Sequence, residues 1–243
     1  MTLVTAVELH GAEKAYPGGG FHLGPVDLQI ALGRTVAVLG KNGSGKSTLF
    51  HLLTGNHDAT AGTILIGGEK MHRGAYDLKR RLGYLPQHMD LPRWVTGFEI
   101  LSYAARLYEL ADPKACIATA MDIWDFASYA YKPMAACSYG MQKRVGLALA
   151  TFHDPQVLIL DEPFSGLDLF HIKALEDTIT TRRDGGRVTI VSTHVASYAA
   201  RHCHQAYIIR AGRLVAVHGW DQLGFSERIA ALEELFFGAG KEV

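Results

Sequence analysis

Residues 35–48 read TVAVLGKNGSGKST, and this stretch decides how the rest of the chain is interpreted. The apolar run Thr35–Leu39 predicts a strand buried on both faces. The loop after it matches the phosphate-binding pattern G-x-x-x-x-G-K-[ST] at every defined position, and a helix, Lys46–Thr54, is expected to follow. A glycine-rich turn with an incidental lysine is the alternative, which the flanking strand and helix disfavour. The chain is therefore predicted to bind a nucleoside triphosphate.

The loop residues have separate physical tasks. Glycines let the backbone curl closely around an anion, and the N–H groups of the turn and of the helix N-terminus attract phosphate. We predict that Lys46 reaches the outer phosphates and that the Ser47 hydroxyl is a ligand of Mg²⁺. The residues expected to hold the nucleotide here are Gly40, Asn42, Gly43, Ser44, Gly45, Lys46, Ser47 and Thr48.

The composition excludes several classes of protein. The chain has 243 residues, 48% of them hydrophobic and 20% charged, as expected for a globular protein with a sizeable core. Lys+Arg and Asp+Glu both number 24, and this balance argues against broad nucleic-acid binding. The start of the chain lacks the features of a signal peptide, and no window approaches the roughly 18 apolar residues of a membrane span. Three cysteines without C-x-x-C spacing favour buried thiols in a reducing compartment: Cys116, Cys137 and Cys203.

The spacing of apolar residues predicts alternating strands and helices. Besides Thr35–Leu39, the predicted strands are Val4–His10, Val26–Ile30, Thr63–Ile66, Val157–Leu160, Val188–Val191, Tyr207–Arg210 and Leu214–Val217. Besides Lys46–Thr54, the predicted helices are Glu99–Leu110, Ala115–Phe126, Met141–Phe152, Asp168–Thr181 and Glu227–Phe237. The strand–helix–strand order after residue 155 implies a parallel sheet. We therefore expect one α/β nucleotide-binding domain over 1–243, with a helical insertion at 88–155 and a C-terminal helix within 225–243.

Two adjacent carboxylates, Asp161 and Glu162, follow the apolar run Val157–Leu160. Buried carboxylates cost free energy unless a cation or a reaction uses them. Asp161 is predicted to hold Mg²⁺, directly or through a water, and Glu162 to face the attacking water as a general base. A capping pair at a strand-to-loop junction is the alternative, which the phosphate-binding loop disfavours.

From Tyr16 to about Trp220 the sequence resembles the ATP-binding cassette (ABC) family, the ATPase subunits of membrane transporters. The resemblance implies a P-loop NTPase fold with a mixed or parallel core sheet, an antiparallel β subdomain and a helical insertion. It also implies ATP as the nucleotide, bound with Mg²⁺. Tyr16 resembles the aromatic residue that stacks on adenine, a contact worth about 1–3 kcal/mol. A core tyrosine is the alternative there.

Further motifs follow in the family's order. Gln87 resembles the glutamine that touches Mg²⁺ and the attacking water and that senses the transmembrane partner. Asp168, at the end of Ser165–Asp168, resembles the loop that crosses to the opposing subunit. His194 resembles the switch histidine that contacts the γ-phosphate, although a lone histidine is more often structural.

The signature motif departs from the family pattern. The family usually reads Leu-Ser-Gly-Gly-Gln, whereas residues 137–141 read Cys-Ser-Tyr-Gly-Met. Ser138 and Gly140 are kept at the start of a predicted helix, whose positive end would still face a phosphate. In the family this surface contacts ATP held by a second cassette, so a homo- or heterodimer is expected. Tyr139 and Met141 resemble the variants of bacterial exporter-type cassettes, which favours export.

The function that the resemblance implies is an ATPase that powers translocation through separate membrane-spanning permease subunits. The protein is then expected in the cytoplasm, on the inner face of the membrane and not inserted into it. A soluble cassette of the translation-factor, DNA-repair or iron–sulfur assembly kind is the alternative. Zinc at His202–His204 is disfavoured, because no other Cys/His pair completes four ligands. The aromatics of the insertion are expected in its core or in a groove for a membrane subunit: Tyr103, Tyr108, Trp124, Tyr129 and Tyr131.

Overall fold

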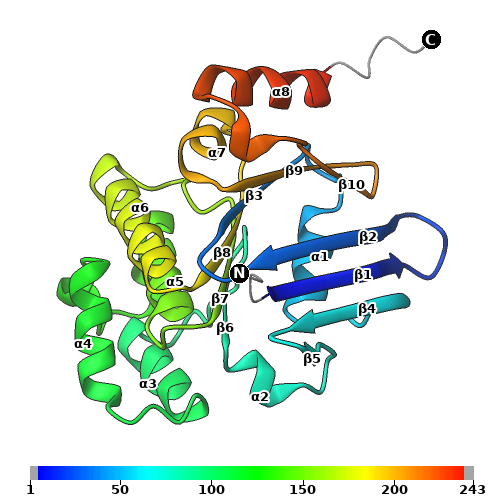
Figure 1. The fold of residues 1–243 in the computed structure, drawn as a ribbon. Coiled ribbons are helices and arrows are strands. Elements are labelled where there is room, and N and C mark those ends of the chain that lie inside the picture. The colour runs from blue at the N-terminus through cyan, green and yellow to red at the C-terminus, as the bar shows by residue number, and fades with distance from the viewer. Residues whose placement is uncertain (1–4, 238–243) are drawn as a thin grey trace.

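The structure is a computed structural model that describes residues 5–237 (Figure 1). Its strands are β1 (Thr5–Ala15), β2 (His22–Ala31), β3 (Thr35–Leu39), β4 (Ala61–Ile66), β5 (Glu69–Lys70), β6 (Leu82–Leu85), β7 (Val157–Asp161), β8 (Val188–Ser192), β9 (Gln205–Arg210) and β10 (Arg213–Ala216). Its α-helices are α1 (Lys46–Leu53), α2 (Tyr76–Lys79), α3 (Gly97–Leu107), α4 (Pro113–Ile123), α5 (Tyr139–Thr151), α6 (Leu169–Asp184), α7 (Ala196–His202) and α8 (Phe225–Phe237). Short 3₁₀ turns lie at Ala127–Tyr129, Met134–Ala136 and Trp220–Gln222.

A six-stranded sheet in the order β10-β9-β3-β8-β7-β6 forms the centre of the molecule. Its strands β9, β3, β8, β7 and β6 pair in parallel, and β10 adds an antiparallel edge. Every residue of β3, β7 and β8 is buried, as expected for parallel strands covered on both faces. Because parallel strands end at one edge, the loops after β3, β7 and β8 all emerge on the same side of the sheet.

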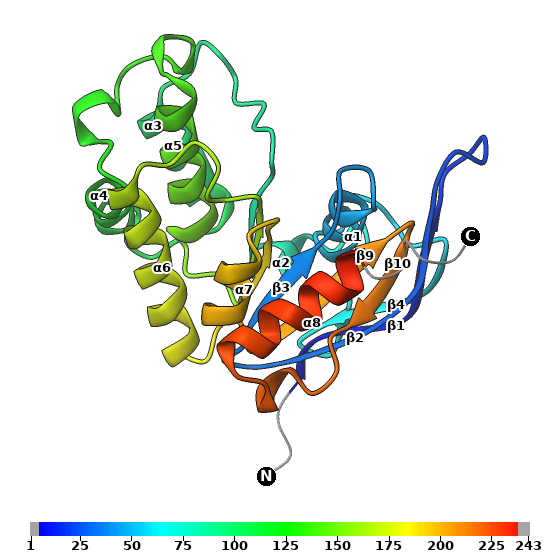
Figure 2. The same cartoon turned by 90° about the horizontal axis from the view of Figure 1, so that it is seen from above.

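Alternate residues of the central strands serve two separate hydrophobic cores, because successive side chains of a strand point to opposite faces. Leu158 and Leu160 belong to a core shared with the helices α3–α8, whereas Val157 and Ile159 belong to a core shared with α1 and the second sheet. The second sheet is antiparallel, in the order β2-β1-β4-β5. Helix α1 lies between the two sheets (Figure 2) and buries Leu49, Phe50, Leu52 and Leu53 there.

Helices α3, α4, α5 and α6 lie together on the side of the molecule away from the antiparallel sheet (Figures 1 and 2). The cluster is fixed by large buried side chains, among which Trp124 and Phe126 are fully covered. Helix α3 begins with a capping box, in which Thr96 accepts from Glu99 N and the Glu99 carboxylate accepts from Thr96 N. Helices α3 to α5 fall inside the predicted insertion, and its limits of 88 and 155 stay a prediction.

The predicted fold class is confirmed, with differences at several elements. Strand β1 runs on to Ala15, and β2 already begins at His22, because irregular pairing around Leu9–Lys14 interrupts the alternation on which the prediction relied. The elements α2, β5, β6 and α7 were not predicted as such. The first predicted residue of β1, Val4, and the last six residues of the predicted C-terminal region lie outside the described residues.

Candidate active site

The loop between β3 and α1 forms one wall of a cavity of about 570 Å³. Two loop positions have backbone angles that favour glycine: φ is +77° at Gly43 and +118° at Gly45. A Cβ atom on Gly45 would lie 2.9 Å from Phe21 Cζ, which also lines the cavity. The cavity therefore lies at the N-terminus of α1, where an anion is favoured. Its other lining residues are Tyr16, Lys41, Asn42, Lys46, Ser47, Thr48, Gln87 and His88.

Lys46 is the charged group at the base of this cavity. Its side chain is 6% exposed, and Nζ donates to the carbonyls of Gly40 and Lys41 at 2.6 and 3.2 Å. An ammonium group has three N–H donors, which suit phosphate oxygens equally well. Gly40 and Ser44 belong to the same loop but do not line this cavity, and a Cβ on Gly40 would lie 2.5 Å from Ser44 Oγ.

Asp161 ends β7 next to the loop and is buried, with 1% of its surface exposed. Its Oδ2 accepts from the hydroxyl of Ser47 at 3.0 Å, and its Oδ1 accepts from the hydroxyl of Ser192. A carboxylate and a hydroxyl oxygen are hard oxygen donors, the type of ligand that Mg²⁺ prefers. The residues present at this position fit a magnesium ion.

Glu162 follows Asp161 in a left-handed backbone conformation, with φ at +47°. Its N–H donates to Ser192 Oγ at 2.8 Å, and its carbonyl accepts from Lys143 Nζ at 2.7 Å. Its carboxylate accepts from His194 Nδ1 at 2.9 Å. The side chain of Glu162 is mostly covered, whereas that of His194 is 72% exposed. The structure thus brings the predicted base and the predicted switch histidine into direct contact.

Lys143 reaches this site from the inner face of α5. It is 1% exposed, and burial lowers its pKa to about 8, while the carboxylates of Glu162 and Asp161 oppose that shift. The sequence reasoning did not single out Lys143. A lysine inside an apolar helical face is the signal that could have found it, because its neighbours Val145, Leu147 and Ala148 are all buried.

Gln87 and Tyr16 line the cavity from two other segments. Gln87 follows β6, and its carbonyl accepts from the Tyr139 hydroxyl at 3.4 Å. Tyr16 follows β1, and its hydroxyl lies 3.1 Å from His57 Nδ1 and 3.4 Å from Thr48 Oγ1. The ring of Tyr16 is half-buried and is available at the edge of the cavity, so it is not a core tyrosine.

Ser138, Gly140 and Asp168 do not line the cavity of their own chain. Ser138 is exposed and caps α5, where its hydroxyl accepts from Met141 N at 3.3 Å. Asp168 caps α6 and accepts from His171 N at 3.0 Å; this bond, and another from the His171 side chain, hold its pKa below the usual range. A Cβ on Gly140 would lie 3.2 Å from the carbonyl of Gly166. The two helix N-termini therefore stand side by side, facing outward.

Comparison with known proteins places this site in a family. Residues 23–165 match the family described as ABC transporter. This chain belongs to the ABC transporter family. It is 32% identical to the Nod factor export ATP-binding protein I of Sinorhizobium fredii, over 98% of this chain and 70% of that protein. It is also 32% identical to the cobalt import ATP-binding protein CbiO of Rhodobacter capsulatus, over 89% of this chain and 79% of that protein. A solved ATP-binding subunit of an ABC transporter superposes with a TM-score of 0.82 at 26% identity, over 94% of this chain and 99% of that one.

The family confirms the fold, ATP as the nucleotide and ATP hydrolysis coupled to transport. The soluble, non-transport alternative is not favoured. Export stays a prediction, because an import protein and an export protein are equally similar to this ABC subunit. Within residues 5–237, no helix is both long enough and apolar enough to cross a membrane.

Ser192 is the other site residue that sequence reasoning missed. It ends β8 and pairs in register with Asp161 of β7, so its hydroxyl lies between the Asp161 carboxylate and the backbone of Glu162. Its signal in the sequence is its position, since it directly follows the apolar run Val188–Val191, beside His194.

The structure bears on two expectations about cysteine and histidine side chains: that the three thiols are buried, and that His202–His204 does not bind zinc. Cys137 and Cys203 are buried free thiols, whereas Cys116 is only half-buried. At His202–His204, as elsewhere between residues 5 and 237, no group of three or more His, Cys, Asp and Glu side chains is arranged to hold a metal ion.

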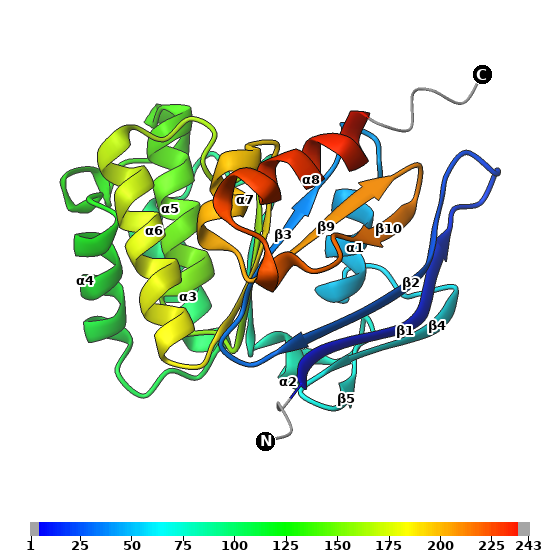
Figure 3. The same cartoon turned by 45° about the horizontal axis from the view of Figure 1, so that its top comes forward.

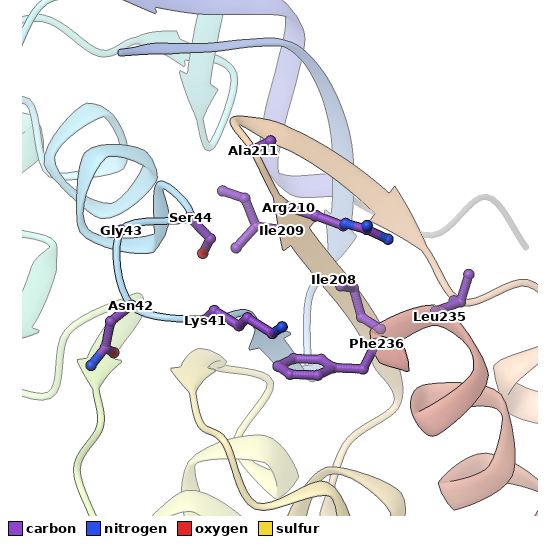
Figure 4. Close-up of a pocket in the computed structure, with 10 residues that line it drawn as sticks. All are labelled: Lys41, Asn42, Gly43, Ser44, Ile208, Ile209, Arg210, Ala211, Leu235 and Phe236. Atoms are coloured by element: carbon purple, nitrogen blue, oxygen red, sulfur yellow. The ribbon is translucent and has the colours of Figure 1, made fainter. Parts of the chain in front are cut away.

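The C-terminal helix α8 packs on its own chain, with Leu232 buried in the helical core. Its end closes a second cavity of about 330 Å³ behind the phosphate-binding loop (Figure 4). Phe236 lies beside Lys41 and Ile208 in this cavity, and Leu235 also lines it. The helix thus lies beside β3 and β9 (Figure 3), and its end reaches the loop at a cavity that shares Lys41, Asn42 and Gly43 with the nucleotide cavity.

Proposed function

We propose that ATP is hydrolysed in the cavity at the N-terminus of α1, with Glu162 as the general base. The observation that carries the proposal is the hydrogen bond between Glu162 and His194, on loops that follow neighbouring parallel strands beside the phosphate-binding loop. A carboxylate with its backbone held on both sides is well placed to accept a proton from water. His194, largely exposed, is free to turn toward the γ-phosphate and stabilise its developing charge.

We infer that Mg²⁺ is held by Ser47, Asp161 and Gln87. When bound, the ion neutralises charge on the β- and γ-phosphate oxygens. The other contacts to ATP come from residues of the chain. Lys46 exchanges its two backbone carbonyl partners for phosphate oxygens, the α1 N-terminus orients the phosphates, and Tyr16 offers its ring to the base of the nucleotide.

We infer that the site is completed by a second cassette, identical or different. Ser138, Gly140 and Asp168 lie at outward-facing helix N-termini and away from their own chain's cavity, so they can serve the nucleotide of a partner. The exposed apolar side chains of Leu169 and Phe170 directly beside Asp168 support a contact there.

We infer that separate permease subunits dock on the helices α3 and α4, which keeps the protein at the inner face of the membrane. A groove of about 810 Å³ lies there, lined by Phe98, Ile117, Met121 and Tyr131 among others. Of the five aromatics expected in this region, Trp124 and Tyr129 are core residues and Tyr108 is largely covered, whereas Tyr103 and Tyr131 are each 67% exposed. Exposed aromatics beside an apolar groove are typical of a protein interface.

Replacing Glu162 with glutamine tests the proposed base. Glu162→Gln should retain ATP binding, because the amide keeps the size of the side chain and the residues proposed to hold the phosphates are unchanged, and should lose about 10²–10⁴-fold in turnover. Phosphate release measures turnover, and titration with a fluorescent ATP analogue measures binding. The matched control is Glu69→Gln, at an exposed carboxylate that pairs with Arg81, and it should hydrolyse ATP normally. Near-normal turnover of Glu162→Gln would remove Glu162 from the proposed role.

A further inference from the structure

Tyr139 stands where the family signature has its first glycine, and its side chain contacts the catalytic loops of its own chain. Its ring packs on Gly166, where a Cβ atom would lie 2.7 Å from Tyr139 Cε1. Its hydroxyl donates to the Gln87 carbonyl at 3.4 Å. Lys143, one turn further along α5, places Nζ 5.9 Å from the centre of the same ring. Tyr139 thus contacts two loops around the site and lies beside Lys143 of its own helix.

Lys143 carries the contact from this ring to Glu162. Its buried ammonium group donates to the Glu162 carbonyl, and the N–H of the same residue donates to Ser192. A non-glycine residue at φ +47° persists only where its surroundings hold it there. Lys143 and Ser192 hydrogen-bond to the backbone of Glu162 on its two sides, one from α5 and one from β8.

We propose that Lys143 and Tyr139 are positioning residues for hydrolysis, which fix the backbone of Glu162 and thereby aim its carboxylate. Lys143 holds the Glu162 carbonyl, and Tyr139 covers Lys143 and connects it to Gln87 and Gly166. The inference rests on the proposed role of Glu162 as the base. Helix α5, which begins at the signature motif, then acts on the site of its own chain through Lys143 and Tyr139. Its Ser138 acts on the nucleotide of a second cassette.

The test is a double-mutant cycle on the full-length protein. Lys143→Met should lower kcat by on the order of 10- to 100-fold, because small misplacements of a catalytic group cost that much. KM and the affinity for a fluorescent ATP analogue should stay unchanged, since Lys143 does not line the ATP cavity. In the Glu162→Gln background the same substitution should have no further effect on single-turnover hydrolysis, because a residue that acts only through Glu162 has nothing left to position.

Control variants separate positioning from folding. Lys143→Arg keeps a cationic donor and should recover part of kcat. Tyr139→Gly removes a half-exposed side chain, so its cost to folding is smaller than that of Lys143→Met, and it should lower kcat severalfold in the wild-type background alone. Tyr139→Phe keeps the ring and should retain most of the activity.

The outcomes distinguish the inference from the function on which it rests. An active Glu162→Gln variant overturns the proposed base. An inactive Glu162→Gln variant leaves the base standing. If in that case Lys143→Met and Tyr139→Gly have wild-type kcat, or lose equally in both backgrounds, the positioning role is overturned. Unchanged kcat for Tyr139→Gly decides against it even if Lys143→Met fails to fold.

Discussion

At the scale of single residues, the site depends on a few buried polar groups that sequence motifs do not mark. Glu162 and Asp161 follow a recognisable apolar run, and both were predicted from it. Their partner Ser192 could have been inferred only from the strand register, and Lys143 only from its place inside an apolar helical face. Their hydrogen bonds join elements that are distant in the chain, so no local pattern encodes them.

Ser192 provides a prediction at this scale. Its hydroxyl is fully buried and bridges the Asp161 carboxylate and the Glu162 N–H. Ser192→Ala leaves both groups short of a partner, so the free energy of unfolding should fall by about 1–3 kcal/mol and turnover should fall with it. Urea denaturation measures the first effect. The matched control is Thr189→Val in the same strand, whose hydroxyl has no hydrogen-bond partner in the described part of the chain and whose loss should not destabilise. Equal destabilisation by both variants would count against the bridging role.

At the scale of elements, strong apolar runs were predictable and interrupted ones were not. Strands β3, β7 and β8 match their predicted ranges to within a residue, because burial on both faces leaves an unbroken apolar run. Strand β6 was missed because Gly83 weakens its pattern. The structure explains the glycine: a Cβ at Gly83 would lie 2.0 Å from the Ala150 carbonyl of α5. The need for glycine at this position comes from the packing of α5 against β6, which the sequence of β6 alone does not show.

His153, just beyond α5, provides a prediction about the contact between α5 and β6. Its Nε2 donates to the Leu82 carbonyl at 3.0 Å, and its buried Nδ1 has no partner among residues 5–237. Burial lowers its pKa to about 4, from an ordinary value of 6.5. The unfolded chain therefore takes up this proton first, so folding free energy is lost as pH falls from about 6.5 to about 4, by at most about 3 kcal/mol. In His153→Gln, urea midpoints measured across that range should depend less on pH; an unchanged dependence would exclude His153 as the cause.

At the scale of the whole molecule, the two hydrophobic cores support different parts of the proposed site. The core around α1 and the antiparallel sheet supports the ATP cavity, and the helical core carries α5 and α6, whose N-termini face outward. The family resemblance predicted the antiparallel subdomain and the helical insertion, whereas the two separate cores are a finding of the structure. In the dimer that we propose, one chain's cavity is completed by the outward N-termini of another.

The most direct test is the mass of the Glu162→Gln variant in solution, measured by light scattering with and without ATP. We expect a monomer without nucleotide and a dimer with ATP. We also expect that Ser138→Arg, added to the same chain, still binds ATP and stays monomeric, because the bulky cation blocks the shared surface. A mass that does not depend on ATP, or a Ser138→Arg variant that dimerises as readily, would contradict the proposed dimer.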